Sequence, residues 1–446
     1  MKKLFGTDGM RGVAGDYPLD PPTIHALGRA LVSLLRAEDL PPRVLIGRDT
    51  RESGRWIEEV LARGVRAARG TACSAGIIPT SGVSFLTRQH AFSAGIVISA
   101  SHNPFRDNGI KIFSSAGFKI PDAWEIRLEQ ALPGLTGTVV PRSPAEGALT
   151  DHFAHDYREF LAHRLEGFSP ARRLKVVVDA ANGAAAGFAP AILSRLGFDV
   201  AKMGVSPDGR NINAACGSLH PQKLAARVVE LGADIGIAYD GDADRALWVD
   251  ETGRLLNGDH TLFVLARHLR KTGRLSSGKV VATVMSNMGL EIALERMDLR
   301  LIRTRVGDKY VLEKMREIGA ELGGEQSGHT ILLEECPTGD GILTSLRMLE
   351  VLASSDKPLS ALVRGLREFP QVLVNVPVAR KTDFKDIPAV AAEIDRADKR
   401  LARRGRLEVR YSGTEPLARV MVEGEDLHEI QEIAHRIGDA IAEELG

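Results

Sequence analysis

The chain is 446 residues long, and its 58 lysines and arginines balance 58 aspartates and glutamates. This balance argues against general binding to nucleic acid or anionic membranes, and no stretch is long and apolar enough to span a bilayer. The length allows roughly three or four domains of about 100–150 residues. The three cysteines lack metal-ligand spacing, and no apolar run follows the N-terminal lysines. We therefore expect unpaired thiols, no secretory signal and a cytoplasmic location.

In chain order, three successive parts of the sequence repeat one order of strands and helices. The predicted strands are residues 43–47, 71–77, 93–98 and 109–113 in the first part, 174–179, 199–203, 233–239 and 246–250 in the second, and 279–284, 299–303, 320–323 and 330–333 in the third. The predicted helices are residues 54–69, 80–88, 184–196, 221–231, 289–296 and 307–318. Strands and helices that alternate in this way form βαβ units on mostly parallel sheets.

The C-terminal part has a different pattern. It predicts strands at 372–378, 407–411 and 418–423 and then a helix over 426–445, with Asp426 as N-cap and Glu429 at capping-box spacing. We expect an α/β fold with three similar βαβ-type, mixed-sheet domains and a C-terminal α+β domain. The expected domains are 1–150, 151–253, 254–368 and 369–446, and the expected linkers 132–147, 252–258 and 354–358. Because the third strand of each repeat ends in a distinctive loop, we expect these loops to meet in one central cleft.

The first of these loops, residues 99–104, reads Ser-Ala-Ser-His-Asn-Pro and is called the serine loop below. Open α/β sheets place ligands where strands end. Pro104 disfavours helix at the residue before it, so we expect an exposed loop. Ser101, with His102 beside it and Lys111 on the next predicted strand, suits a nucleophile or a phosphate carrier. An ordinary turn of Ser, Asn and Pro is the alternative.

The second loop, residues 240–245, reads Asp-Gly-Asp-Ala-Asp-Arg. Asp240, Asp242 and Asp244, called the aspartate triad below, would share one side of an extended chain. Clustered carboxylates need a cation, and oxygen ligands favour Mg²⁺, Mn²⁺ or Ca²⁺ over zinc. An EF-hand is a competing interpretation, but it requires glycine where Arg245 stands, and helices where we predict strands.

A segment near the C-terminus, residues 410–416, reads Arg-Tyr-Ser-Gly-Thr-Glu-Pro between two predicted strands. The guanidinium of Arg410, the hydroxyls of Ser412 and Thr414 and the open backbone at Gly413 suit a phosphate dianion. Arg419 on the next strand would add positive charge. A tight hairpin without a ligand is the alternative.

Two glycine-rich segments remain. Residues 323–329 read Gly-Gly-Glu-Gln-Ser-Gly-His, in which Glu325 and Ser327 suit a polyhydroxylated ligand and His329 closes the loop. A surface turn is the alternative there. Residues 5–12 read Phe-Gly-Thr-Asp-Gly-Met-Arg-Gly and are either plain loop or an anion contact made by the backbone and Arg11.

Together these motifs resemble the α-D-phosphohexomutase superfamily, and most closely its bacterial phosphoglucosamine branch, over nearly the whole chain. The resemblance implies four domains around one cleft and a phosphoserine at Ser101. It also implies one Mg²⁺ ion held by the aspartate triad and the seryl phosphate. Lys309 stands where this branch more often has arginine, which keeps the charge but loses the bidentate geometry.

The resemblance implies conversion of glucosamine 6-phosphate to glucosamine 1-phosphate through a 1,6-bisphosphate, feeding UDP-N-acetylglucosamine and cell-wall precursor synthesis. Ser101 would be the phosphoryl carrier, Lys111 or His102 the proton carrier, and Arg11 a neutraliser of charge. The expected substrate-binding residues are Arg245, Lys309, Glu325, Ser327, His329, Arg410, Ser412, Gly413, Thr414 and Arg419. Small-molecule sugar phosphates are the expected partners, without nucleic acid or membrane, and a homodimer is an open expectation. Alternatives are mutases of mannose or glucose phosphates, a Mg²⁺-dependent sugar phosphatase and a non-catalytic sugar-phosphate sensor.

Overall fold

The structure is a computed structural model that describes all residues except 1–3, 7, 136–150, 167–171, 403 and 413–415. The chain divides into two compact units. The larger unit contains Met1–Thr283 and Thr304–Arg364, and the smaller unit contains Val284–Arg303 and Gly365–Gly446. Each unit is described by itself below.

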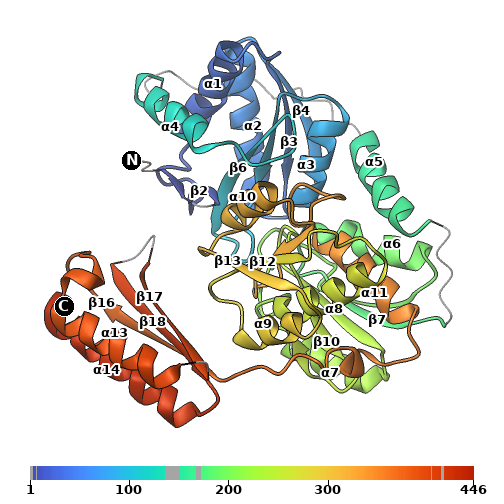
Figure 1. Cartoon of the computed structure of the whole chain (residues 1–446). Coiled ribbons are helices and arrows are strands. Elements are labelled where there is room, and N and C mark those ends of the chain that lie inside the picture. The colour runs from blue at the N-terminus through green and yellow to red at the C-terminus, as the bar shows by residue number, and fades with distance from the viewer. Residues whose placement is uncertain (1–3, 7, 136–150, 167–171, 403, 413–415) are drawn as a thin grey trace. The chain divides into compact units, whose positions relative to one another are not determined.

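The first sheet of the larger unit has six strands in the order β1-β2-β6-β5-β3-β4. Strands β3, β4 and β5 are parallel, whereas β1, β2 and β6 join antiparallel. Helices α1 and α2 cover one face and α3 covers the other (Figure 1), so β5 is buried on both faces and is apolar throughout. The elements are β1 (Phe5–Gly6), β2 (Gly9–Val13), α1 (Pro21–Ala37), β3 (Arg43–Arg48), α2 (Glu52–Ala67), β4 (Thr71–Ile77), α3 (Thr80–Gln89), β5 (Ala94–Ile98), β6 (Asp107–Ser114) and α4 (Asp122–Ala131).

The second sheet has five strands in the order β11-β10-β9-β7-β8. Strands β9 and β10 form a hairpin in which Tyr239 pairs with Ala246, so the six residues of the second predicted loop close it. The elements are α5 (Asp151–Ala162), β7 (Lys175–Asp179), α6 (Ala189–Arg195), β8 (Asp199–Met203), α7 (Gln222–Leu231), β9 (Ile235–Tyr239), β10 (Ala246–Asp250) and β11 (Leu255–Leu256).

A third set of strands completes the larger unit. Strand β14 pairs parallel with β12 and antiparallel with β15, so the 323–329 segment again joins two neighbouring strands. The elements are α8 (Gly258–Lys271), β12 (Lys279–Thr283), α10 (Asp308–Ile318), β14 (Leu322–Gly324), β15 (Thr330–Leu332), α11 (Gly341–Ala353) and α12 (Leu359–Leu362).

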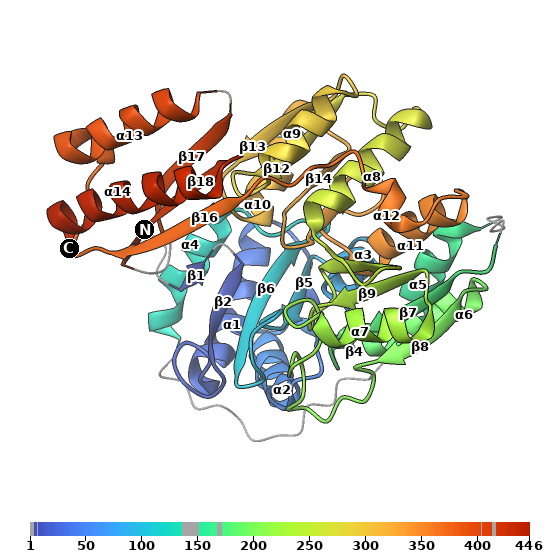
Figure 2. The same ribbon diagram turned by 90° about the horizontal axis from the view of Figure 1, so that it is seen from below.

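The smaller unit contains a three-stranded antiparallel sheet in the order β16-β18-β17. Helices α13 and α14 lie along this sheet (Figure 2) and enclose an apolar core that includes Val420, Ile433 and Ile437. The elements are α9 (Met288–Glu295), β13 (Arg300–Thr304), β16 (Gln371–Pro377), α13 (Pro388–Leu401), β17 (Gly405–Tyr411), β18 (Leu417–Gly424) and α14 (Leu427–Leu445).

Three local predictions need comment. Residues 184–196 are not one helix, because a 3₁₀ turn at Ala184–Gly187 precedes α6, which has Pro190 in its first turn. The glycine-rich residues 5–12 include the strands β1 and β2 rather than plain loop. Asp426 is the N-cap of α14 as predicted, while the Glu429 carboxylate pairs with Arg400 at 2.9 Å. In the described part of the chain, no helix has the length and apolar composition that crossing a membrane would require.

Candidate active site

The serine loop leaves the carboxyl end of β5 in a tight turn. Ser101 has φ 54°, a left-handed conformation that a non-glycine residue adopts at some cost. Its backbone N–H donates to Ser99 Oγ at 2.9 Å, and Ser99 Oγ donates to Asp49 Oδ2 at 2.6 Å. The expectation of an exposed Ser101 is wrong, since the residue is 0% exposed. The turn folds it inward against neighbouring loops instead.

A buried arginine supports this turn from below. Arg51 Nη2 donates to the carbonyl oxygens of Ser101 at 3.0 Å and Asn103 at 2.8 Å, and Nη1 donates to that of Asp107 at 3.0 Å. Its Nε pairs with Asp49 Oδ2 at 2.9 Å, which balances the buried charge. The sequence analysis does not identify Arg51, whose only signal is an acid and an arginine two residues apart after a buried strand.

The aspartate triad gathers at the end of β9, on the hairpin loop that leads to β10. One carboxylate oxygen from each residue lies within 4.8 Å of the others. The extended conformation that we predicted is wrong. Ala243 has φ 58° and its N–H donates to the Asp240 carbonyl at 3.1 Å, so a turn brings the side chains together.

The triad contacts the predicted phosphoryl carrier directly, because Ser101 Oγ donates to Asp240 Oδ2 at 2.6 Å. Burial raises the pKa of Asp240 well above its ordinary value, and the charges of Asp244 and Asp242 raise it further. The buried Oδ1 atoms of Asp242 and Asp244 accept no hydrogen bond from any described residue. Buried oxygens of this kind need a positive partner, so the donor set suits a hard divalent cation.

Lys111 supplies positive charge to the same carboxylates. It lies on β6 opposite Val97 of β5, and its Nζ is 2.9 Å from Asp242 Oδ2, 3.3 Å from Asp244 Oδ2 and 3.1 Å from Asp8 Oδ2. Burial by itself would lower the pKa of Lys111, but the three carboxylates raise it well above the ordinary value. The ammonium therefore stays charged at neutral pH.

Asp8 is a site residue that the sequence analysis did not select, although it lies in the 5–12 segment. It pairs with Lys111, with Lys119 Nζ at 2.5 Å and with Arg11. These cations outweigh burial and lower the pKa of Asp8. Lys119 also pairs with Asp308 at 2.6 Å. Only the folded chain reveals this network, because its members are far apart in sequence.

His102 lies beside Ser101 but is a weak base here. Its Nδ1 is 3.3 Å from Ser101 Oγ and 3.3 Å from Arg245 Nη1. Burial, with the positive charges of Arg245 and Arg11, lowers the pKa of His102 to about 4. The imidazole is therefore neutral at pH 7.

The 323–329 loop has one exposed and two buried members among its predicted site residues. Ser327 is exposed, whereas Glu325 is buried and accepts from the Gly307 N–H at 3.1 Å. Burial raises the pKa of Glu325 above its ordinary value. His329 Nδ1 is 3.6 Å from Asp244 Oδ2. Burial alone would lower the pKa of His329, but this contact and nearby acidic charge raise it overall.

Two predicted cations of the larger unit have other contacts. Arg11 lies on β2, where its Nη1 donates to the Ala100 carbonyl at 3.4 Å, so it lies next to the serine loop. Lys309 lies on α10 and pairs with Asp122 on α4. The structure thus joins the serine loop, the triad, Lys111 and His329 by direct contacts, while the ammonium of Lys309 is paired outside this group.

The smaller unit contains the remaining predicted residues. Arg410 on β17 pairs across the sheet with Arg419 on β18, and both are half-buried. Burial lowers the pKa of Arg410, and the charge of Arg419 lowers it further. Ser412 is buried, and its carbonyl accepts from Lys381 Nζ at 2.7 Å. Gly413 and Thr414 lie outside the described residues.

Comparison with known families gives four matches in order along the chain. The models are those of phosphoglucomutase/phosphomannomutase alpha/beta/alpha domain I at residues 2–135, domain II at 155–253, domain III at 257–369 and the C-terminal domain at 373–440. The four-domain α/β fold class that we predicted is therefore confirmed.

Solved structures and curated relatives agree with this. A phosphoglucomutase/phosphomannomutase family protein from Burkholderia thailandensis is 25% identical with a TM-score of 0.81, and the match covers 99% of this chain and 98% of that one. The N-acetylphosphoglucosamine mutase of Aspergillus fumigatus, solved with GlcNAc-6P and magnesium, is 19% identical with a TM-score of 0.68 over 99% of this chain and 96% of that one.

Among curated proteins, the phosphoglucosamine mutase of Koribacter versatilis is 49% identical over 100% of this chain and 98% of its own length. That of Solibacter usitatus is 46% identical over 100% and 99%. Identity at this level over complete chains, together with the four family matches and the serine loop beside the aspartate triad, leads to one conclusion. The chain belongs to the phosphoglucosamine mutase family of the α-D-phosphohexomutase superfamily.

Proposed function

We propose that this protein interconverts glucosamine 6-phosphate and glucosamine 1-phosphate and so supplies the synthesis of UDP-N-acetylglucosamine and cell-wall precursors. Family membership supports the reaction class. The observation that carries the proposal is the contact of Ser101 Oγ with Asp240 Oδ2 at 2.6 Å, inside a buried group of three carboxylates. A serine hydroxyl on a metal-binding carboxylate cluster suits phosphoryl transfer better than simple binding.

We propose Ser101 as a phosphoserine and the aspartate triad as the ligands of one Mg²⁺ ion. The Oδ1 atoms of Asp242 and Asp244, which accept no hydrogen bond from described residues, support this assignment. Bound Mg²⁺ would neutralise the charge of the transferring phosphoryl group. Lys111, held by the same carboxylates, would add a second positive charge on the protein side.

The reaction needs two transfers. In the first, the 1-hydroxyl of glucosamine 6-phosphate attacks the phosphorus on Ser101, the bond from phosphorus to Oγ breaks, and the hydroxyl proton passes to a protein base. In the second, Oγ attacks the 6-phosphorus of the resulting 1,6-bisphosphate after it has turned over. The O6–phosphorus bond breaks, O6 takes a proton, and glucosamine 1-phosphate leaves. Atoms and charge balance without a further reactant.

The residues divide the work as follows. We propose neutral His102 as the group that accepts the hydroxyl proton, because its Nδ1 lies 3.3 Å from Ser101 Oγ, whereas Lys111 is held in its charged form. Glu325 would accept from sugar hydroxyls. In the smaller unit, Arg410 and Arg419 would bind the phosphate that is not reacting, since two adjacent guanidinium groups favour a dianion.

A coupled assay tests the proposal. Purified protein is given glucosamine, glucose and mannose 6-phosphates, each 1-phosphate is detected enzymatically, and inorganic phosphate is followed in parallel. We expect glucosamine 1-phosphate without stoichiometric phosphate release. Stoichiometric phosphate would make the protein a sugar phosphatase, and tight binding of glucosamine 6-phosphate without any turnover would make it a sensor.

A further inference from the structure

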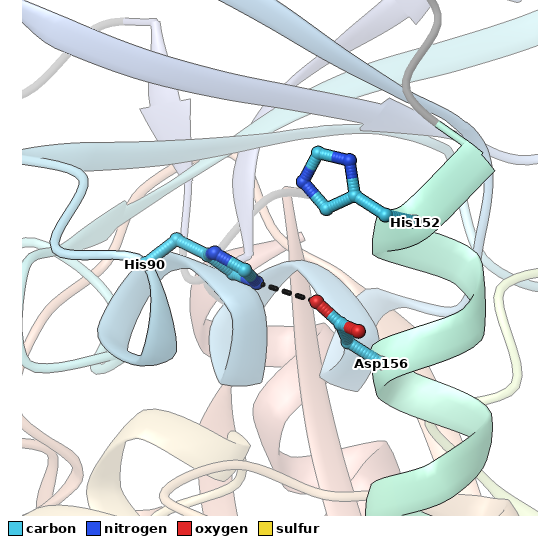
Figure 3. Close-up of side chains that lie close together, drawn as sticks. All are labelled: His90, His152 and Asp156. Carbon is cyan, nitrogen blue, oxygen red and sulfur yellow. Dashed lines mark ion pairs between the residues drawn. The ribbon is translucent and has the colours of Figure 1, made fainter.

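A second group of potential metal ligands lies in the larger unit, on elements other than those of the serine loop and the triad. His90 follows the last turn of α3, and His152 and Asp156 lie one turn apart on α5 (Figure 3). Residues four apart on a helix share one face, so α5 presents an imidazole and a carboxylate together. All three side chains point into the space between the two helices.

The spacing of these side chains fits one small ion. His90 Nε2 lies 2.9 Å from Asp156 Oδ2, and one ligand atom from each of the three residues lies within 4.8 Å of the others. A tetrahedral zinc ion with bonds of about 2.0–2.1 Å places its ligand atoms about 3.4 Å apart. The widest pair therefore has to close by at most about 1.4 Å, which a side-chain rotation achieves.

The ion pair between His90 and Asp156 does not account for the whole arrangement. His90 Nε2 is buried and makes no hydrogen bond with any described residue, despite its closeness to the carboxylate. The ring of His152 stands at 61° to that of His90, with centroids 5.6 Å apart. Between them, buried Phe153 contacts both imidazoles, at 5.1 Å and 4.2 Å between ring centroids, and so limits their rotation.

We propose that His90, His152 and Asp156 form a metal site that binds a transition-metal ion of the zinc class and leaves one coordination position to water. Imidazole ligands select such ions, whereas the all-oxygen aspartate triad selects Mg²⁺. The two sites would therefore hold different metals in one chain. His152 is exposed, which gives an ion access from solvent, and the bound ion would fix the first turns of α5 to the end of α3.

Zinc binding to the whole protein, with Mg²⁺ present in excess, tests this site. Isothermal titration with Zn²⁺ is run on the wild type, His152→Gln and His90→Gln. The matched control is His155→Gln, which removes an exposed histidine from the same helix outside the cluster. We expect one Zn²⁺ equivalent in the wild type and the control to be lost, or weakened at least about 10- to 100-fold, in the two cluster variants. Equal zinc binding by all four proteins, or none by the wild type, would overturn the proposal.

Two further measurements separate this result from misfolding and from zinc on cysteine. Far-ultraviolet circular dichroism and mutase activity of each variant should match the wild type, and Zn²⁺ should raise the Tm of the wild type and His155→Gln only. X-ray absorption of the zinc-loaded protein should show nitrogen and oxygen ligands. Sulfur ligands would instead assign the ion to a thiol such as Cys73 or Cys216 and reject the histidine site.

Discussion

The aspartate triad of the larger unit and the arginine pair of the smaller unit, Arg410 and Arg419, both place like charges side by side. In the triad, Lys111 lies within 3.3 Å of two carboxylates and offsets their repulsion. In the arginine pair, the charge of Arg419 adds to burial in lowering the pKa of Arg410. Repulsion within the triad is thus offset by the protein, whereas at the arginine pair an anionic ligand would relieve it.

This difference separates two functions. A compensated, buried cluster is organised before the ligand arrives, which suits a centre where bonds break. A half-buried cationic pair gains most when a dianion binds, which suits a site that holds substrate. Substitutions in the first should therefore lower kcat most, and substitutions in the second should raise KM most.

The largest effect should come from Ser101→Ala. Without Oγ there is no phosphoryl carrier, so we expect kcat to fall by at least about 10³-fold. The lost hydrogen bond to Asp240 should lower the free energy of unfolding by only about 1–3 kcal/mol. Mass spectrometry of the active wild type should find phosphate on Ser101.

Ser101→Gly is the matched control, because glycine adopts the positive φ of this position without cost. It should be as inactive as Ser101→Ala and no less stable. Full activity in either variant would end the proposed mechanism.

The next effect concerns the metal. Asp242→Asn removes a charge from the triad while keeping its shape, so we expect Mg²⁺ binding to weaken and kcat to fall by about 100-fold or more. Asp199→Asn, at an exposed carboxylate on β8, should change neither. Undiminished turnover of the wild type after thorough chelation would contradict a metal role for the triad.

A smaller effect is expected at the arginine pair. Arg410→Ala should raise KM roughly 10- to 100-fold, the range for loss of a charged hydrogen bond, with less change in kcat. Arg410→Lys should recover part of the loss, because charge returns without the bidentate geometry. Arg400→Ala, in an exposed ion pair of the same unit, is the control and should leave KM unchanged. If Arg410→Ala lowers kcat alone, the two functions are not divided as proposed.

Much of the fold and part of the site could be predicted from local sequence. Buried strands such as β5 are short apolar runs, and the triad is six consecutive residues whose side chains have one common chemistry. Helix α1 was not predicted because Pro21 and Pro22 resemble a loop, although proline is tolerated in the first turn of a helix.

Other features depend on contacts between distant parts of the chain. Arg51 supports Ser101 from 50 residues away, and Asp8 meets Lys111 across two strands. The left-handed turns at Ser101 and Ala243 are also not predictable, because neither residue is glycine and the surrounding fold imposes the conformation. The roles of the site residues, the domain boundaries, the central cleft and the homodimer stay predictions.

The smallest effect should be the choice of sugar, since both charge clusters bind groups that glucose, mannose and glucosamine phosphates share. The 323–329 loop is the candidate for ring contacts, through buried Glu325. Because the intermediate must turn over, such contacts should touch hydroxyls that exchange places, plausibly those at positions 3 and 4, and these hydroxyls do not identify the amine. We expect kcat/KM for glucosamine 6-phosphate to exceed that for glucose 6-phosphate by at least about tenfold, which needs only about 1.4 kcal/mol. Glu325→Ala should depress both substrates together. A loss confined to one sugar would show that this loop recognises position 2.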